Sequence, residues 1–259
     1  RDASPFDGKR PNSIATGVTM SAKLVQAKSL TKKFGDFTAL ERCSIEIGEG
    51  EVFGLLGPNG AGKSTFLRLL LGFLKPTSGS AEIGGLDCLQ QRVEVHRMVS
   101  YLPGDARLFR MMRARKMLGI FCGFREDASF EKAVEIADRL ELDLSRWVGL
   151  MSTGMRQKLA LAITLCSQTP LVILDEPTAN LDPTVRGRVM ELVNEAKASG
   201  RTVIFSSHVL PEIEATCDRV GILRAGQLVH LESMSRLKKQ HRILANLNGD
   251  LPDLPGGLR

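Results

Sequence analysis

The stretch Gly57-Pro58-Asn59-Gly60-Ala61-Gly62-Lys63-Ser64-Thr65 decides the fold, because it fits the phosphate-binding pattern G-x-x-x-x-G-K-[ST]. It lies between a predicted strand, Glu51–Gly57, and a predicted helix, Lys63–Leu74, as the pattern requires. Glycines let backbone N–H groups surround phosphates, and the helix N-terminus adds its positive end. Lys63 can then reach the β- and γ-phosphates of a nucleotide, and the Ser64 hydroxyl can bind Mg²⁺.

Two carboxylates end a second predicted strand farther along the chain. Leu171–Leu174 is fully apolar, as expected for a strand buried on both faces, and Asp175 and Glu176 follow it. A metal bound to phosphate needs an acidic partner, so Asp175 is predicted to hold Mg²⁺ through water. Glu176 is predicted to polarise the water that attacks the γ-phosphate. The two motifs together predict nucleotide hydrolysis.

The rest of the chain alternates between strands and helices. The region from about residue 103 to 167 reads as mainly helical, and the apolar side chains of Phe130–Leu140 fall on one helix face. Asp182 can cap a helix that begins with Pro183 and ends at Gly200. The other predicted strands are Leu24–Leu30, Cys43–Ile47, Thr202–Ser206 and a hairpin of Val220–Leu223 with Gln227–Leu231. This order predicts an α/β parallel-sheet core with a helical insertion.

Composition sets the outer limits. The 259 residues, 43% of them hydrophobic, suit one large domain or a domain with a small appendage, and the net charge of +6 favours anionic partners. The five cysteines are scattered, which argues against a disulfide framework or a zinc site and fits a reducing compartment. We expect no membrane span, because no apolar run approaches the required length of about 18–20 residues. Arg1–Lys23 also lacks the apolar run of a secretory signal.

A third motif resembles part of a known family. Met151-Ser152-Thr153-Gly154-Met155-Arg156-Gln157 is similar to the signature sequence of the ATP-binding subunits of ATP-binding cassette (ABC) transporters, whose common form is Leu-Ser-Gly-Gly-Gln. Ser152 and Gly154 match that form, whereas Thr153 and Met155 depart from it. The wording Gly-Met-Arg-Gln-Lys is similar to that of the drug- and polysaccharide-exporting members.

The resemblance covers roughly residues 24–235 and implies a fold and a domain plan. The fold is α/β, a P-loop NTPase core with a mostly parallel sheet, an antiparallel β subdomain and a helical subdomain at about residues 104–167. Residues 1–23 are then a flexible N-terminal tail. Residues 236–259 form a C-terminal tail, the start of an accessory module that is cut off.

The resemblance also assigns site residues. Residues 179–182 resemble the D-loop, Phe34 matches the aromatic that stacks on adenine, and His208 resembles the switch histidine. Lys63, Glu176 and His208 are then catalytic. ATP lies in a head-to-tail homodimer or heterodimer, between the phosphate-binding stretch of one chain and Ser152 and Gly154 of the other. The list of ATP-binding residues is Phe34, Gly57, Pro58, Asn59, Gly60, Ala61, Gly62, Lys63, Ser64, Thr65, Ser152 and Gly154, and Mg²⁺ is the cofactor.

One expected residue is missing. The family usually has a glutamine after Tyr-Leu-Pro, where this chain reads Tyr101-Leu102-Pro103-Gly104-Asp105. Glycine has no side chain that could contact a metal or water, so that role does not pass to Gly104. Either Asp105 supplies an oxygen to the metal instead, or the site does without one.

The function implied by the resemblance is a cytoplasmic ATPase subunit, peripheral on the cell membrane, that hydrolyses MgATP and drives export through a separate polytopic permease. Five cations in residues 107–116 lie near the expected permease contact and suit anionic headgroups, an acidic partner loop or a solvated helix face. The alternative is a related ATPase that acts on ribosomes or nucleic acid. Those relatives carry long coiled coils, two cassettes or zinc modules, features that this sequence lacks, so we expect no nucleic-acid partner. A GTPase would need an Asn-Lys-x-Asp motif, and the sequence contains none. The five cations of residues 107–116 are Arg107, Arg110, Arg113, Arg115 and Lys116.

Overall fold

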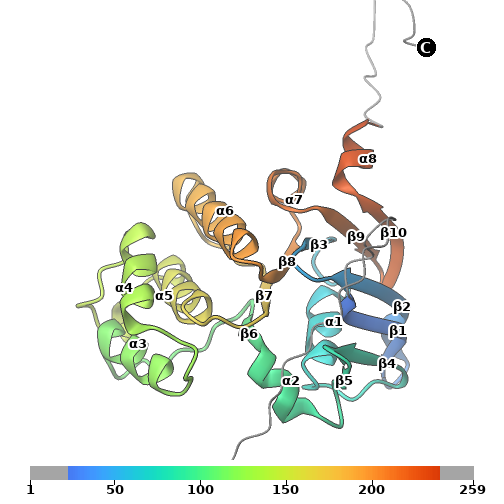
Figure 1. Ribbon diagram of the computed structural model, residues 1–259, viewed down its shortest axis with the longest axis horizontal. Coiled ribbons are helices and arrows are strands. Elements are labelled where there is room, and N and C mark those ends of the chain that lie inside the picture. The colour runs from blue at the N-terminus through green and yellow to red at the C-terminus, as the bar shows by residue number, and fades with distance from the viewer. Residues whose placement is uncertain (1–22, 240–259) are drawn as a thin grey trace, which may run out of the picture.

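The computed structural model describes residues 23–239, which form two sheets and eight α-helices in that range. Helices α3, α4 and α5 gather at one end, a four-stranded antiparallel sheet lies at the other, and a six-stranded sheet stands between them (Figure 1). The fold therefore has the three parts that the sequence predicts.

The six-stranded sheet has the order β10-β9-β3-β8-β7-β6. All its pairs are parallel except that of β9 with the edge strand β10. The pairing sets Asp175 beside Ser206 and Leu56 beside Ser207, so the ends of three strands meet at one edge of the sheet. Ligands bind at this carboxyl edge in open α/β sheets. The strands are β3 (Val52–Leu56), β6 (Val99–Leu102), β7 (Leu171–Asp175), β8 (Thr202–Ser207), β9 (Arg219–Arg224) and β10 (Gln227–Ser233).

The antiparallel sheet has the order β2-β1-β4-β5 and longer strands than predicted. The apolar alternation indicated only Leu24–Leu30 and Cys43–Ile47. The structure extends both strands to a hairpin at Gly35, whose φ of 57° is left-handed. Polar residues near the hairpin continue the ladder because backbone pairing needs no apolar side chain. The strands are β1 (Lys23–Phe34), β2 (Phe37–Gly48), β4 (Ser78–Ile83) and β5 (Leu86–Asp87).

The region from residue 103 to 167 holds three α-helices joined by loops, rather than continuous helix. They are α3 (Ala114–Gly123), α4 (Phe130–Arg139) and α5 (Thr153–Leu165), with a 3-10 turn at Val148–Leu150. The predicted face of α4 is confirmed: Ala133, Ala137 and Leu140 are buried, and Phe130 and Val134 pack against the core partly buried. Ile136, which was not part of that prediction, is buried as well.

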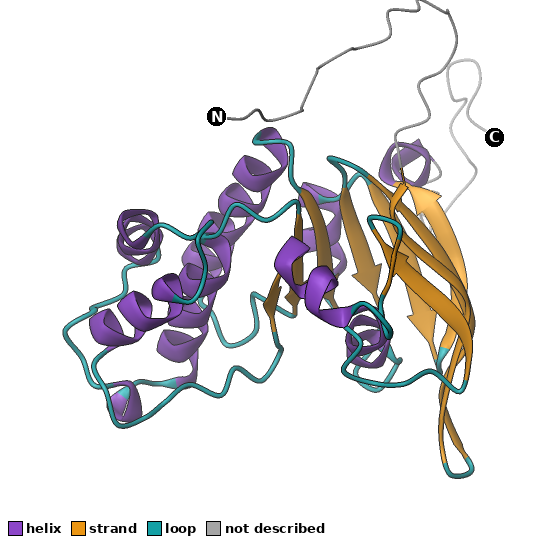
Figure 2. Ribbon diagram, turned by 60° about the horizontal axis from the view of Figure 1, so that its bottom comes forward, coloured by secondary structure: helices purple, strands orange, loops and turns teal. Residues whose placement is uncertain are grey.

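Helices also flank the central sheet (Figure 2). The helix predicted over 63–74 ends earlier, at Leu70, because Gly72 turns left-handed with φ of 65°. The helix after Asp182 is confirmed: the Asp182 side chain accepts a hydrogen bond from the Val185 amide. The flanking helices are α1 (Lys63–Leu70), α2 (Arg92–Met98), α6 (Pro183–Ala198), α7 (Leu210–Thr216) and α8 (Met234–Lys239).

The core lies on both faces of the central sheet. Val172 and Leu174 join the apolar cluster shared with the helical end, whereas Leu171 and Ile173 join the cluster beneath the antiparallel sheet. Alternate residues of a strand point to opposite faces, so one apolar strand serves both clusters. This is why Leu171–Leu174 contains no polar residue.

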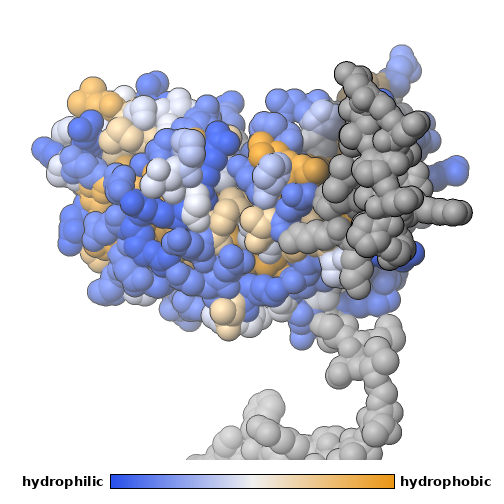
Figure 3. Space-filling model, turned by 90° about the horizontal axis from the view of Figure 1, so that it is seen from above, coloured by the Kyte–Doolittle hydropathy of each residue, from blue (hydrophilic) through white to orange (hydrophobic). Residues whose placement is uncertain are grey.

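The predicted domain boundaries can be compared with the observed helices and strands. Helix α8 runs across position 235, so the predicted boundary there cuts a helix. The predicted tails are residues 1–23 and 236–259. Lys23 begins β1 and residues 236–239 belong to α8, and the remainder of both tails lies outside the described residues. Within residues 23–239 no helix combines the length and apolar character needed to span a bilayer. The face seen in Figure 3 is mostly hydrophilic, with small separate apolar patches.

Candidate functional site

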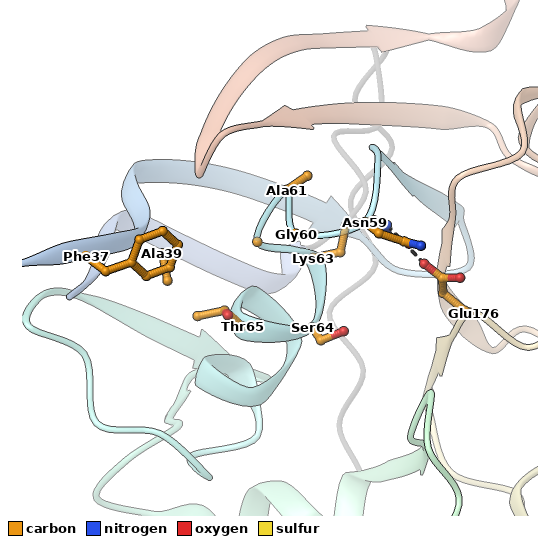
Figure 4. Close-up of a pocket in the computed structure, with 10 residues that line it drawn as sticks. Phe37, Ala39, Asn59, Gly60, Ala61, Lys63, Ser64, Thr65 and Glu176 are labelled. Carbon is orange, nitrogen blue, oxygen red and sulfur yellow. Dashed lines mark ion pairs between the residues drawn. The ribbon is translucent and has the colours of Figure 1, made fainter. Parts of the chain in front are cut away.

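The phosphate-binding stretch surrounds a cavity of about 250 Å³ at the carboxyl edge of the central sheet (Figure 4). Gly60 and Gly62 have φ values of 80° and 102°, a left-handed conformation that side chains rarely adopt. A Cβ on Gly62 would also lie 2.7 Å from the Ala39 carbonyl oxygen. Both glycines are therefore required by the turn. The lining residues are Phe37, Ala39, Asn59, Gly60, Ala61, Gly62, Lys63, Ser64, Thr65 and Glu176.

Lys63 is a buried cation whose partners are all in this loop and at the end of β7. Its Nζ donates to the carbonyl oxygens of Gly57 at 2.7 Å and Pro58 at 3.2 Å. It also forms an ion pair with Glu176 Oε1 at 3.0 Å, across the cavity (Figure 4). A buried ammonium needs such partners. The arrangement fixes the Lys63 ammonium at the wall of the cavity, beside Glu176.

Asp175 and Glu176 are both fixed by Ser206 of β8. Asp175 is 1% exposed and accepts a hydrogen bond of 2.7 Å from Ser206 Oγ. The Glu176 amide donates to the same Oγ at 3.0 Å. Sequence reasoning missed Ser206, although a serine at the end of an apolar strand was a usable signal. Ser206 thereby holds the Asp175 carboxylate and the Glu176 backbone at the end of β7.

His208 completes a chain of contacts through Glu176. Its Nδ1 lies 2.9 Å from Glu176 Oε2, while Oε1 is held by Lys63. An ionised carboxylate only accepts hydrogen bonds, so Nδ1 is the donor. The structure thus brings together the three residues that the sequence predicted as catalytic.

A second buried acid, Glu212, connects the segment that follows Glu176 to the residue that precedes His208. Glu212 is 8% exposed, and its Oε2 accepts from Thr178 Oγ1 at 2.9 Å and Ser207 Oγ at 2.7 Å. Thr178 follows Glu176 closely in sequence, and Ser207 precedes His208. Sequence reasoning missed Glu212 because an acid in a short helix reads as a solvated surface residue.

The signature residues lie away from the cavity of their own chain. Ser152 caps α5, where its Oγ accepts from the Met155 amide at 3.2 Å. Gly154 packs so closely on the residue-179–182 segment that an added Cβ would lie 2.6 Å from the Asn180 carbonyl oxygen. Neither Ser152 nor Gly154 lines the cavity.

Gln157 links the signature helix to the acidic strand end. It is 5% exposed, and its amide donates to the carbonyl oxygens of Glu176 at 3.4 Å and Pro177 at 3.3 Å. The start of α5 is thereby coupled to the backbone that carries Glu176.

The aromatic residues near the cavity differ from the prediction in one respect. Phe34 is 49% exposed and lies under the ammonium of Lys32, 4.8 Å from the ring centre, but does not line the cavity. Phe37, across the hairpin from Phe34, does line it. Sequence reasoning missed Phe37, for which the nearby Phe-Gly pattern was the available signal.

The position of the missing glutamine is close to the buried carboxylate. A Cβ on Gly104 would lie 3.5 Å from Asp175 Oδ2. Asp105 instead points outward: its side chain is 80% exposed and accepts from Arg107 Nε at 3.2 Å. The structure therefore places Gly104, not Asp105, beside Asp175.

The donor set at this edge fits a magnesium ion bound with a nucleotide. Ser64 and Asp175 offer a hydroxyl and a carboxylate oxygen, the hard ligands that Mg²⁺ prefers. No group of three or more His, Cys, Asp or Glu side chains in residues 23–239 could hold a metal alone. A Mg²⁺ ion here would draw its other ligands from phosphates and water, as it commonly does.

The five cysteines are buried, free thiols. Cys122 and Cys166, far apart in sequence, have their sulfur atoms 3.7 Å apart.

Comparisons with known proteins identify the family of this chain. The family described as "ABC transporter" matches residues 40–179. The Nod factor export ATP-binding protein I of Rhizobium meliloti (strain 1021) is 34% identical over 88% of this chain and 71% of its own. The probable multidrug ABC transporter ATP-binding protein YbhF of Escherichia coli (strain K12) is 34% identical over 91% of this chain. The match spans only 40% of YbhF.

A solved structure described as the ATP binding subunit of an ABC transporter superposes with a TM-score of 0.74. It is 27% identical and covers 84% of this chain and 92% of its own. These matches confirm the predicted P-loop NTPase fold with its two subdomains. The chain belongs to the ABC transporter family.

Proposed function

We propose that this chain binds MgATP and hydrolyses it as the ATP-binding subunit of an exporter. The single observation that carries the proposal is the contact chain from Lys63 through Glu176 to His208, beside the buried Asp175. It joins a phosphate-binding cation, a base and a residue that orients the base within one cavity edge. Those are the parts that phosphoryl transfer to water requires.

Each residue has a chemical task in this proposal. Lys63 leaves Glu176 to bind the β- and γ-phosphates, and Glu176 then accepts a proton from water as the water oxygen bonds to the γ-phosphorus. The bond between that phosphorus and the bridging oxygen breaks, which releases ADP and phosphate. His208 keeps the freed carboxylate oriented. Ser64 and Asp175 would hold Mg²⁺, which neutralises charge on the phosphates.

The adenine contact has two candidates. Phe34 remains our proposal for stacking, and its ring is 49% exposed. Phe37 lines the cavity and is the direct competitor. Separate Phe34→Ala and Phe37→Ala variants decide between them. Only the variant that removes the stacking ring should bind ATP more weakly while its affinity for inorganic triphosphate is unchanged.

The test of hydrolysis is Glu176→Gln. The amide cannot take the proton, so turnover should fall on the order of a hundredfold or more while ATP binding is kept. Glu191→Gln is the control, because Glu191 is a surface acid whose side chain is 67% exposed. Steady-state phosphate release and equilibrium ATP binding measure the two effects. Near-normal turnover in Glu176→Gln would remove it from the role of base.

We also propose that the active form is a head-to-tail dimer with two composite sites. The position of Ser152 and Gly154 away from the cavity of their own chain supports this, since a second chain must then bring them to the nucleotide. Lys63→Ala and Ser152→Arg proteins should each be inactive. On mixing, activity should return towards about a quarter of the wild-type value, because one site of each mixed dimer is intact. Specific activity that is independent of protein concentration, with active single variants, would contradict the dimer.

The partner we propose is a polytopic permease, with the subunit peripheral on the cytoplasmic face of the membrane. The name of the Nod factor export relative supports export. The cationic segment also presents exposed apolar side chains: Phe109 is 61% and Met111 89% exposed. Leu150 is 80% exposed and follows Gly149, whose amide donates to the Arg110 carbonyl oxygen of this segment. An acidic permease loop suits this surface. Affinity purification from native membranes should recover a polytopic protein, and recovery of ribosomes instead would favour a non-transport ATPase.

A further inference from the structure

Two basic side chains are buried in the described part of the chain, and only one of them has a carboxylate partner there. Lys63 is 5% exposed and Arg201 is 7% exposed. Burial of a charge is costly unless the charge is paired. Lys63 is paired with Glu176 in the nucleotide cavity. No carboxylate of residues 23–239 forms an ion pair with Arg201, so its charge is unmatched.

Arg201 has only partial hydrogen bonding. It lies just before β8, where its Nε donates to the Thr169 carbonyl oxygen at 2.9 Å and its Nη2 to Thr169 Oγ1 at 3.4 Å. Its Nη1 has no hydrogen-bond partner within the described ranges and is not fully buried, since Glu212 Oε1 is the one fully buried side-chain N or O atom there that lacks such a partner. The negative charge of Asp127 acts on Arg201, but Asp127 is bound to Arg125 at 2.9 Å. Burial lowers the pKa of the Arg201 guanidinium, yet an arginine stays charged in a protein.

Arg201 lines a second cavity of about 250 Å³, bounded by α4, the end of α5 and α6. These three helices lie together on one side of the molecule (Figure 1). Its apolar wall consists of buried side chains: Ile136, Leu165, Leu192 and Ala196. Its polar residues are Lys132, Gln168, Glu195, Ser199 and Arg201.

The other charges on the wall are already matched. Arg139 holds Glu195 with two hydrogen bonds of 2.7 and 2.6 Å. Lys132 is paired with Glu135 at 2.9 Å. Arg201 alone among the lining charges has no opposite partner, so the cavity offers one positive charge beside an apolar wall.

We propose that this cavity binds a small organic carboxylate, with its carboxylate on the Arg201 guanidinium and its apolar body against α4 and α6. A single unmatched cation suits a monoanion better than a phosphate with two charges. The apolar wall suits a hydrocarbon group. The volume has room for about eight water-sized groups, and hexanoate is of that size.

The test is binding of hexanoate to the full chain, measured by calorimetry and by line broadening of labelled hexanoate. Wild-type protein should bind it saturably, and hexanamide, which lacks the charge, should bind at least about tenfold more weakly. Arg201→Gln should also weaken hexanoate binding by about tenfold or more. Ala196→Leu is a second variant that fills the cavity and leaves the Arg201 side chain in place, and it should abolish binding.

Two controls separate this site from the nucleotide site and from folding. Lys63→Ala should lose ATP binding and keep hexanoate binding, whereas Arg201→Gln should do the reverse. Arg224→Gln changes an exposed arginine and should alter neither. The proposal is overturned if wild-type protein shows no saturable binding, if hexanamide binds equally well, or if folded Arg201→Gln or Ala196→Leu binds as the parent does. Arg201 would then be a structural residue that only anchors Thr169.

Discussion

Ser206→Ala should destabilise the protein and slow ATP turnover together. Ser206 is fully buried and gives Asp175 its hydrogen bond of 2.7 Å. A hydrogen bond to a charged group contributes about 1.5–3 kcal/mol. Asp175 is 1% exposed, so water cannot easily replace the lost donor. The Glu176 amide keeps a second acceptor, the Ser206 carbonyl at 3.2 Å, which limits the expected loss to about 2–3 kcal/mol.

Urea unfolding and steady-state phosphate release measure the two effects on the same samples. The control is Ser100→Ala, a buried serine on β6 whose partner, Thr169 Oγ1 at 2.8 Å, is neutral. That variant should lose about 1 kcal/mol and keep its turnover. Turnover of Ser206→Ala should fall on the order of tenfold, because the Asp175 carboxylate and the Glu176 backbone amide each lose a positioning contact. Equal stability losses in the two variants, with full turnover in Ser206→Ala, would refute the reasoning.

Three further predictions follow from close contacts, exposure and burial. Gly154→Ala should cost about 1–3 kcal/mol, because its Cβ would lie 2.6 Å from the Asn180 carbonyl oxygen. Gly187→Ala in α6, with nothing within 4 Å, should instead gain about 0.5–1 kcal/mol in the same urea titration. Because the Asp105 side chain is 80% exposed and points away from Asp175, Asp105→Ala should change stability by less than about 0.5 kcal/mol and leave magnesium-dependent turnover unchanged, and a loss of that turnover would restore Asp105 as the metal ligand. Burial raises the pKa of the Cys217 thiol to about 12, so iodoacetamide at mildly alkaline pH should label it only after unfolding, as mass spectrometry can check. The unfolded Cys217 thiol ionises near pH 9.0, whereas the folded thiol stays protonated up to about pH 12. The free energy of unfolding should therefore fall as the pH rises above 9.0.

The sequence predicts the site residues that belong to short local motifs. Lys63 and Ser64 follow from one glycine-rich stretch, and Asp175 and Glu176 from one apolar strand with an acidic end. Their meeting could be predicted because parallel strands end at a common edge. The observed ion pair between Lys63 and Glu176 is the direct consequence.

The residues that were missed depend on register between distant segments. Ser206 matters because it pairs with Asp175 across two strands. Glu212 matters because it reaches both Thr178 and Ser207. Nothing in the local pattern around either residue reports its partner. Arg201 is similar, since its burial depends on how α4, α5 and α6 pack.

The strand order also has a consequence for folding during synthesis. Strand β3, which supports the phosphate-binding stretch, pairs on both sides with strands from the last third of the described chain, β8 and β9. The Gly50 amide, just before β3, donates to Thr202, 152 residues later. Contacts of such large separation slow folding, because the chain must close a long loop first. A ribosome that has made only the first 200 residues therefore displays a β3 without neighbours, and nucleotide-binding competence should emerge late and abruptly.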